Sequence, residues 1–525
     1  MCGIAGFISL KNTISHSANH LENALERLSR RGPDNKGIYR DKKCELGHTR
    51  LSIIDTSENA NQPMIDSSND YALVFNGEIY NYLDLKKELE KNNTQFKTTS
   101  DTEVLLYGLI KEGKSFINKL NGFFSFCFYD KKNQSYLLAR DRFGIKPLIY
   151  AFDENRLIYG SELKAILAYD IDKNIDKQAL AQYFRHTYIP APRTILKSCK
   201  KLLPGKIIEI TNGEVNIESY YHYYPTKKSE DNYLKAKQKV KELFHESVKK
   251  RLVSDVPLGT FLSGGVDSSI VSAVAKKYKP DLNTFSIGFP DEPIFDESKY
   301  AEKVAKHIGS KHHCFNVTNK DLYENLEDIL DYFDEPMADS SAINVYILAK
   351  ETKQNVTVSL SGDGADELFS GYNKHQALYF SLQNNISNSL IKKFGHFAKW
   401  LPSSRNSKIG NLGRQIDKLY TGLNKSIDDR YLEWASFMEE NSVHQLTNQN
   451  INTNYLEKVT SNQDDFNNFL FYDFKLVLEN DMLRKVDIMS MANSLEVRTP
   501  FLDHELVDYV FSLPSKYKID KGNRK

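Results

Sequence analysis

The segment 261–269, FLSGGVDSS, limits the fold of the second half of the chain more than any other feature. An apolar run near 256–262 leads into its two glycines, and residues 270–277 continue with helical spacing. A strand, a glycine turn and a helix start in this order place backbone N–H groups where they can bind a phosphate. The lysine of the Walker motif is missing, so the segment predicts a different phosphate loop in a parallel α/β sheet.

The polar stretch 225–232, PTKKSEDN, divides the chain. Before it, short strands such as 71–76 lie between helical segments, which indicates layers of sheet covered by helices. After it, a helix over 233–253 leads into alternating strands and helices, the pattern of a parallel sheet. The sequence therefore predicts a first domain over 2–224, a linker, and a second domain over 233–525.

Charge and cysteine content narrow the range of partners. Lysine and arginine total 70 against 69 acidic residues, which gives no reason to expect nucleic acid or an anionic membrane. Five cysteines without CxxC spacing predict neither disulfides nor a zinc site, and favour a reducing cytoplasm. The start MCGIAGFISLKN lacks a signal-peptide pattern, and no stretch reaches the ~20 apolar residues of a membrane span. We expect a cytoplasmic protein with small-molecule partners, and leave a homodimer open.

Cys2 is a candidate nucleophile. Removal of the initiator methionine would put its thiol beside a free α-amine, which titrates near ~8 and can accept the thiol proton. On its own, a cysteine at position 2 would carry little weight. Four further segments change this: RGPD at 31–34, GHTRLS at 47–52, FNGEIY at 75–80 and SDTE at 100–103.

Together with CGIAGF at 2–7, these segments resemble the class II glutamine amidotransferases. The resemblance implies that Cys2 attacks the side-chain amide of glutamine to form a thioester. The oxyanion of that reaction needs fixed donors, and Asn76 with the backbone N–H of Gly77 fits this role. Arg50 is expected to bind the carboxylate of glutamine and Asp101 its amine. The remaining residues of the implied glutamine site are Leu51, Ile53, Ile54 and Glu78.

The second half resembles the asparagine synthetase family, whose enzymes adenylate a substrate and release pyrophosphate. The resemblance runs through SGGVDSS at 263–269, SLSGDGADELF at 359–369 and DIMSMANSLEVRTPFLD at 487–503. It implies that Asp363, where some relatives carry glutamate, promotes formation or amination of an acyl-adenylate. It also implies Mg²⁺ held by Asp267 and Asp366. The implied ATP site comprises Leu262, Ser263, Gly264, Gly265, Asp267, Ser268, Ser269, Ile287, Ser361 and Gly362.

Two arginines carry further expectations. Arg498 is either a ligand for a substrate carboxylate or phosphate, or a buried structural residue paired with Glu496 or Asp503. Arg31 and Leu51 lie in segments that, in the family, face the mouth of an ammonia tunnel.

Near its end the chain shows no match to the family's basic-glycine-phenylalanine motif, whose lysine contacts ATP phosphates. We therefore expect the synthetase domain to lack its C-terminal end, or Lys521, Arg524 or Lys525 to take over that contact.

The resemblance implies an α+β N-terminal amidotransferase domain with layered αββα architecture of the N-terminal-nucleophile type. It implies an α/β C-terminal ATP-pyrophosphatase domain with a parallel sheet and a helical extension. The implied reaction converts L-aspartate, L-glutamine, ATP and water into L-asparagine, L-glutamate, AMP and diphosphate, through β-aspartyl-AMP and channelled ammonia. Two alternatives stay open: another acceptor carboxylate, such as a sugar uronic acid or a peptide bound near 334–341, and a fragment that is only a glutaminase.

Overall fold

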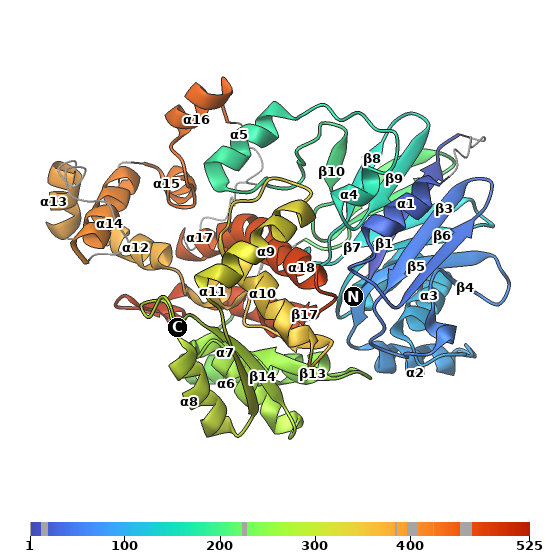
Figure 1. Ribbon diagram of the computed structural model, residues 1–525, viewed down its shortest axis with the longest axis horizontal. Helices are drawn as coiled ribbons and strands as arrows, with labels where there is room; N and C mark the ends of the chain where they lie inside the picture. The colour runs from blue at the N-terminus through green and yellow to red at the C-terminus, as the bar shows by residue number, and fades with distance from the viewer. Residues whose placement is uncertain are drawn as a thin grey trace.

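The computed structural model describes residues 2–11, 19–222, 228–383, 386–395, 408–423, 425–451 and 465–524. Residue 224, where the first domain was expected to end, linker residues 225–227 and Lys525 lie outside these described ranges. Figure 1 shows the strands of the N-terminal half, in blue to cyan-green, on one side of the molecule. No helix in the part of the chain that the structure describes is long and apolar enough to cross a membrane.

Two six-stranded antiparallel sheets form the N-terminal half. The first has the order β10-β8-β9-β1-β3-β2 and the second the order β12-β11-β7-β6-β5-β4. The first sheet contains β1 (Gly3–Ser9), β2 (Asn35–Arg40), β3 (Cys44–Arg50), β8 (Ile149–Phe152), β9 (Arg156–Gly160) and β10 (Cys199–Lys201). The second contains β4 (Met64–Ile65), β5 (Tyr71–Ile79), β6 (Gly122–Asp130), β7 (Ser135–Arg140), β11 (Lys206–Thr211) and β12 (Glu214–Ser219).

The two sheets pack face to face, because alternate side chains of each strand point to the same face. Ile4 and Leu46 of the first sheet share a buried apolar cluster with Val74 and Leu138 of the second. Helices α1 (His20–Arg27) and α4 (Leu163–Ile166) contact the first sheet. Helices α2 (Tyr82–Lys91) and α3 (Asp101–Glu112) pack together, and α3 contacts β5 of the second sheet. The predicted αββα layering is confirmed.

A five-stranded parallel sheet organises the C-terminal half, as predicted. Its order is β15-β14-β13-β16-β17, with strands β13 (Leu258–Phe261), β14 (Asn283–Gly288), β15 (Lys311–Asn316), β16 (Val358–Leu360) and β17 (Glu496–Arg498). The connecting helices are α6 (Tyr233–Arg251), α7 (Val266–Tyr278), α8 (Ser298–Ile308), α9 (Asn319–Tyr332), α10 (Ser341–Lys353) and α11 (Ala365–Phe369). Strand β17, which lies late in the sequence, thus joins the sheet that carries the first glycine turn.

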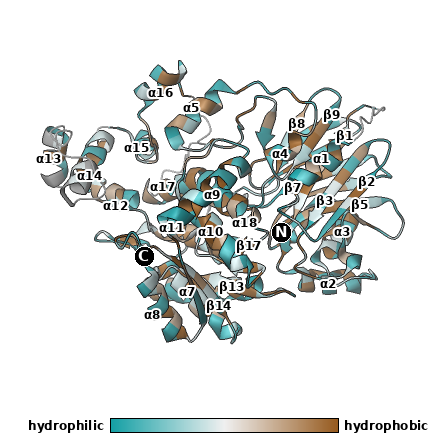
Figure 2. Cartoon of the chain, viewed as in Figure 1, coloured by the Kyte–Doolittle hydropathy of each residue, from teal (hydrophilic) through white to brown (hydrophobic). Residues whose placement is uncertain are grey.

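From Asn373 onward the chain is mostly helical, which is the predicted helical extension. Figure 2 shows hydrophobic and hydrophilic residues interspersed on the coloured helices and strands of both halves. The π-helix η4 (Phe474–Leu483) and helix α18 (Arg484–Met491) follow each other directly and run toward the N-terminal half. The other elements are α5 (Lys177–His186), α12 (Asn373–Ser381), α13 (Ile386–Phe394), α14 (Lys408–Leu423), α15 (Ile427–Trp434), α16 (Glu440–Thr447), α17 (Asp465–Asp473), α19 (His504–Ser512), β18 (Ile519–Asp520) and β19 (Asn523–Arg524).

Candidate active site

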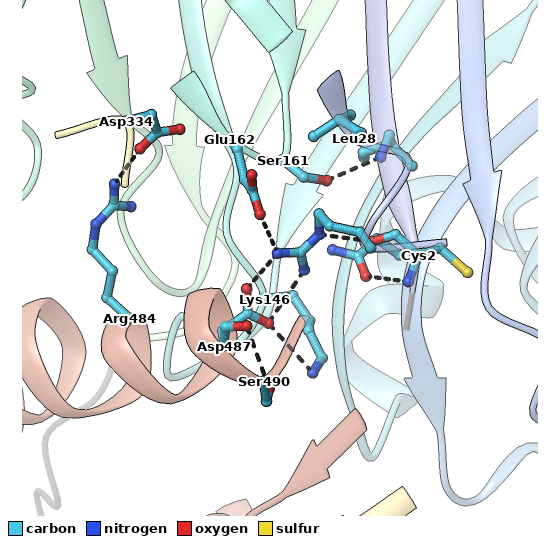
Figure 3. A network of polar contacts seen from close by, with 12 residues as sticks. Cys2, Leu28, Lys146, Ser161, Glu162, Asp334, Arg484, Asp487 and Ser490 are labelled. Carbon is cyan, nitrogen blue, oxygen red and sulfur yellow. Dashed lines mark hydrogen bonds and ion pairs between the residues drawn. The ribbon is translucent and has the colours of Figure 1, made fainter. Parts of the chain in front are cut away.

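Cys2 lies at the start of β1 and is buried, with 7% of its surface exposed. Its backbone nitrogen donates to Oδ1 of Asn76 at 3.0 Å, and its sulfur lies 3.9 Å from the carbonyl oxygen of Leu51. Nε of Arg31 donates to the Cys2 carbonyl oxygen at 3.1 Å. The sulfur points away from the polar network around Asp487 (Figure 3). Burial raises the pKa of the Cys2 thiol, so a base must assist its ionisation.

Asn76 and Gly77 follow each other on β5 beside Cys2. Because Oδ1 of Asn76 accepts from Cys2, the side-chain NH₂ faces the other way, and this buried Nδ2 has no hydrogen-bond partner among the described residues. A Cβ atom at Gly77 would lie 2.2 Å from the carbonyl oxygen of Phe123, so only glycine fits there. An oriented, unused buried donor is what an oxyanion site requires.

Arg50 ends β3 and is wrapped by the loop that follows it. Its Nη1 donates to the carbonyl oxygen of Ser57 and to Oδ1 of Asn61, both at 2.7 Å, and its Nη2 donates to the carbonyl oxygen of Asp55. The same loop holds three residues predicted for the glutamine site, all buried: Leu51, Ile53 and Ile54. Arg50 therefore fixes this loop.

Two buried carboxylates complete the predicted glutamine residues. Asp101 begins α3, and its Oδ2 accepts a 2.9 Å hydrogen bond from the backbone of Ile79. Burial raises the pKa of Asp101 to about 6. Burial also raises the pKa of Glu78, and the Arg498 guanidinium, 3.6 Å from Glu78, counters only part of that effect.

The SGGVDSS segment comprises the turn after β13 and the first residues of α7. Gly264 adopts φ +84°, a left-handed conformation that side chains disfavour, and a Cβ there would lie 2.6 Å from the backbone nitrogen of Ala301. Oγ of Ser268 accepts from the backbone nitrogen of Ser263 at 3.1 Å, which closes the turn. The sequence predicted this strand, glycine turn and helix start, because their order depends on residues that are adjacent in the chain.

A second glycine turn lies between β16 and α11. Oγ of Ser361 donates to Oδ2 of Asp363 at 2.6 Å. A Cβ added to Gly362 would lie 3.1 Å from Cβ of Asp267, so the two turns meet. Asp267 and Asp366 border the same cavity, and their carboxylate oxygens are ligands that Mg²⁺ prefers.

The cavity between the turns has a volume of about 420 Å³. Gly264 and Ser269 do not line it; Oγ of Ser269 donates instead to the carbonyl oxygen of Gly265 at 2.7 Å. Ten predicted residues do line it: Leu262, Ser263, Gly265, Asp267, Ser268, Ile287, Ser361, Gly362, Asp363 and Asp366. Burial raises the pKa of Asp363.

Sequence reasoning missed several polar residues of this cavity, among them Lys485, Glu367 and Tyr372. Lys485 of α18 is the only cation among the described residues that line it, and its Nζ lies 2.5 Å from Oδ2 of Asp339. Glu367 accepts a 2.7 Å hydrogen bond from the hydroxyl of Tyr372, and burial raises the pKa of Glu367 to about 8. The surrounding sequence, with Arg484 before Lys485 and Asp487 after it, carries no signal that singles out Lys485.

Arg498 lies away from the lining of this cavity. Its Nε contacts Oε1 of Glu496 at 2.5 Å, and its Nη1 donates to the carbonyl oxygen of Arg251 at 2.9 Å. Asp503, the other partner considered, pairs with Arg251 at 3.0 Å. The contacts match the buried structural role with Glu496.

Buried charges connect the two sites (Figure 3). Nη1 of Arg31 donates to Glu162 of the N-terminal half and to Asp487 of α18, both at 2.8 Å. Lys146 lies 4.0 Å from the same Asp487 carboxylate. A small cavity of about 20 Å³ adjoins them, and its charged lining residues are Arg140, Glu162, Lys201, Glu479, Arg484 and Asp487.

A buried cysteine at position 2 beside an unused amide donor, on a layered αββα fold, together with two facing glycine turns on a parallel sheet, defines a class II amidotransferase joined to a nucleotide-binding domain. The chain belongs to the asparagine synthase family. The family profile "Asparagine synthase" matches residues 239–525, and the profile "Glutamine amidotransferase domain" matches residues 1–221.

Several curated relatives match nearly the whole chain. Asparagine synthetase [glutamine-hydrolyzing] 1 of Bacillus subtilis (strain 168) is 36% identical over 100% of this chain and 83% of its own length. Asparagine synthetase [glutamine-hydrolyzing] 3 of the same organism is 32% identical with the same coverage. Amidase chyE of Penicillium rubens is 27% identical over 99% of this chain and 83% of its own length.

Proposed function

We propose that this chain catalyses ATP-dependent synthesis of L-asparagine from L-aspartate, with L-glutamine as nitrogen donor and AMP, diphosphate and L-glutamate as the other products. The observation that carries the proposal is the shared cavity of the two glycine turns in a chain that also holds the Cys2–Asn76 pair. The names of the Bacillus relatives support the same reaction. The division into domains 2–224 and 233–525 is part of this proposal.

Ammonia release uses the residues around Cys2. The thiolate attacks the side-chain carbon of glutamine, and the resulting oxyanion is stabilised by Nδ2 of Asn76 and the N–H of Gly77. Collapse breaks the C–N bond, releases ammonia and leaves a thioester, which water hydrolyses to glutamate and free thiol. After removal of Met1, the Cys2 amine takes the thiol proton and passes it to the leaving nitrogen, which departs as ammonia. Asn76 Oδ1 is placed to accept a hydrogen bond from that amine.

Amide formation uses the large cavity. A side-chain oxygen of aspartate attacks the α-phosphorus of ATP, diphosphate leaves, and ammonia then displaces AMP from the acyl-adenylate. Ser263, Ser268 and backbone N–H groups would hold the phosphates. The attack by ammonia releases a proton, and Asp363 is suited to accept it because burial raises its pKa. Asp267 and Asp366 would hold Mg²⁺, which offsets phosphate charge.

Aspartate suits the cavity better than a sugar uronic acid does. Beyond the reacting carboxylate, an amino acid carries one further carboxylate and one ammonium group. The adjacent Lys485 and Asp339 offer one cation and one anion, 2.5 Å apart, for those two groups. A uronic acid has no ammonium group and no second carboxylate, so Lys485 and Asp339 would stay paired with each other.

Ammonia is proposed to pass between the sites inside the protein, which limits its protonation to ammonium. Arg31 and Leu51 adjoin Cys2, and the small charged cavity adjoins Asp487 on the other side of Arg31. These positions support a route between the halves.

The testing experiment incubates the purified chain with Mg-ATP, aspartate and either glutamine or ammonium, and reads amino acids and nucleotides by mass spectrometry. We expect asparagine with equal amounts of AMP and diphosphate from both nitrogen donors. Glutamate without asparagine or AMP would contradict the aspartate assignment. A Cys2→Ala variant serves as control: it should lose synthesis from glutamine and keep synthesis from ammonium.

A further inference from the structure

The glutamine loop, defined as residues 51–61, is held by a residue from the opposite half of the chain. Residues 51–57 of this loop form neither helix nor strand. The carbonyl oxygen of Ile53 accepts a 3.0 Å hydrogen bond from the backbone nitrogen of Asp255. The backbone nitrogen of Asp55 donates to Oδ2 of Asp255 at 2.8 Å. Asp255 thus contacts the loop twice, once as a donor and once as an acceptor.

These two contacts involve loop residues that lie close to Cys2 and Arg50. On one side, the carbonyl oxygen of Leu51 lies 3.9 Å from the Cys2 sulfur. On the other, the carbonyl oxygen of Asp55 accepts from the Arg50 guanidinium. A displacement of Ile53 or Asp55 would therefore move both the wall beside the nucleophile and the arginine expected to bind the glutamine carboxylate.

Asp255 is well placed to resist such a displacement, because its own segment is anchored. Oγ of Ser254 donates to the carbonyl oxygen of Val256 at 2.9 Å and closes a local turn around Asp255. Nη1 of Arg498, on β17, donates to the carbonyl oxygen of Val253 at 2.6 Å. Strand β13, which leads into the first glycine turn, begins at Leu258. The segment is thus attached to the parallel sheet on both sides.

We propose that Asp255 is a positioning residue for glutamine: the nucleotide-binding half uses it to hold the glutamine loop in its binding form. This inference rests on the glutaminase half of the proposed function. Asp255 acts through backbone groups of the loop and touches neither the substrate nor Cys2. Its contribution is to glutamine binding, since the Asn76 and Gly77 donors lie on β5 and do not depend on it.

Asp255 is exposed, so its hydrogen bonds compete with water and their effect is moderate. Loss of a hydrogen bond of this kind corresponds to about a three- to tenfold change in an equilibrium constant. We expect that change in KM for glutamine, with kcat nearly unchanged.

The experiment compares Asp255→Ala and Asp255→Asn in the full chain. Asparagine keeps a side-chain oxygen that can accept from Asp55, so Asp255→Asn should leave KM for glutamine within about twofold of the wild type. Asp255→Ala should raise KM about three- to tenfold. Synthesis from ammonium should be equal in all variants. Asp281→Ala is the matched control, because Asp281 is an exposed aspartate of the same half that lies between α7 and β14.

Hydrogen exchange of residues 51–61 gives a second measurement that needs no activity. The Asp55 amide should exchange faster in Asp255→Ala than in the wild type, and Asp255→Asn should behave like the wild type. Equal KM and equal exchange in Asp255→Ala and wild type would overturn the inference, as would an equal loss of ammonium-dependent synthesis. A wild-type chain that fails to hydrolyse glutamine would instead contradict the proposed function itself.

Discussion

Nη1 of Arg31 lies 2.8 Å from Oδ2 of Asp487, and this buried contact ties the surroundings of the nucleophile to α18 of the other half. We expect Arg31→Ala to destabilise the protein by about 3 kcal/mol, because Asp487 and Glu162 lose their arginine while staying buried. Chemical denaturation measures this change. The neighbouring Arg30, whose ion pair with Asp328 is exposed, is the control, and Arg30→Ala should cost less than about 1 kcal/mol. Equal losses in the two variants would contradict a special role for the buried pair.

Asn76→Ala should slow glutamine hydrolysis about 100- to 1000-fold, because the unused Nδ2 donor is expected to stabilise the oxyanion. Steady-state glutamate release measures the effect on kcat. Synthesis from ammonium is the internal control and should stay intact. If kcat stays the same and only KM rises, Asn76 binds glutamine without stabilising the oxyanion.

The glutaminase reaction should lose efficiency as the pH falls through about 6, the raised pKa of Asp101. Above this pH the carboxylate is charged and can bind the glutamine amine; below it, protonation removes that charge. The charges of Glu496 and Arg498 also affect the pKa of Asp101. The raised pKa of Cys2 affects only the alkaline side of the pH profile. A folded-state pKa above the usual value means that acidification does not destabilise the fold through Asp101.

A pH profile of kcat/KM for glutamine measures this effect. Asp101→Asn should be poor at every pH and should lack the step near pH 6. A step that persists in Asp101→Asn would assign it to another group.

Gly264→Ala should abolish stabilisation of the protein by ATP. The new methyl group would lie 2.6 Å from the Ala301 backbone nitrogen, and φ +84° adds strain, so the turn must change shape. Melting temperatures with and without Mg-ATP measure the loss. Gly309→Ala is the matched control: φ there is +71°, but a Cβ would have no neighbour within 4 Å. That variant should be less stable and still respond to ATP.

Lys485→Met should lower asparagine synthesis from either nitrogen source by at least about tenfold, while glutamine hydrolysis continues. The reason is that the cavity lining would lose its only cation among the described residues. Lys485→Arg keeps the charge and should retain part of the activity. Normal aspartate saturation in Lys485→Met would show that the acceptor binds elsewhere.

The sequence predicted those parts of the fold and sites whose cause is local. The glycine turn at Gly264 and the strand that carries Asn76 depend on adjacent residues, and the structure agrees with both. Lys485 and Asp255 could not be found in this way, because their partners Asp339 and Asp55 lie far away in the chain. The positions of Lys485 and Asp255 depend on how distant segments pack together, and a single sequence does not show that packing. The roles given to the individual site residues stay predictions.

The π-helix η4 and the α-helix α18 form one continuous rod with a consequence for how the enzyme can diverge. Glu479 and Asn480 contact Arg140 and the Ala191 backbone in the N-terminal half, whereas Met482 and Lys485 border the large cavity. A substitution on this rod that adapts the cavity to a new acid would also disturb its contacts with the ammonia-releasing half. Mutations that change acceptor choice should therefore accumulate at lining residues outside this rod.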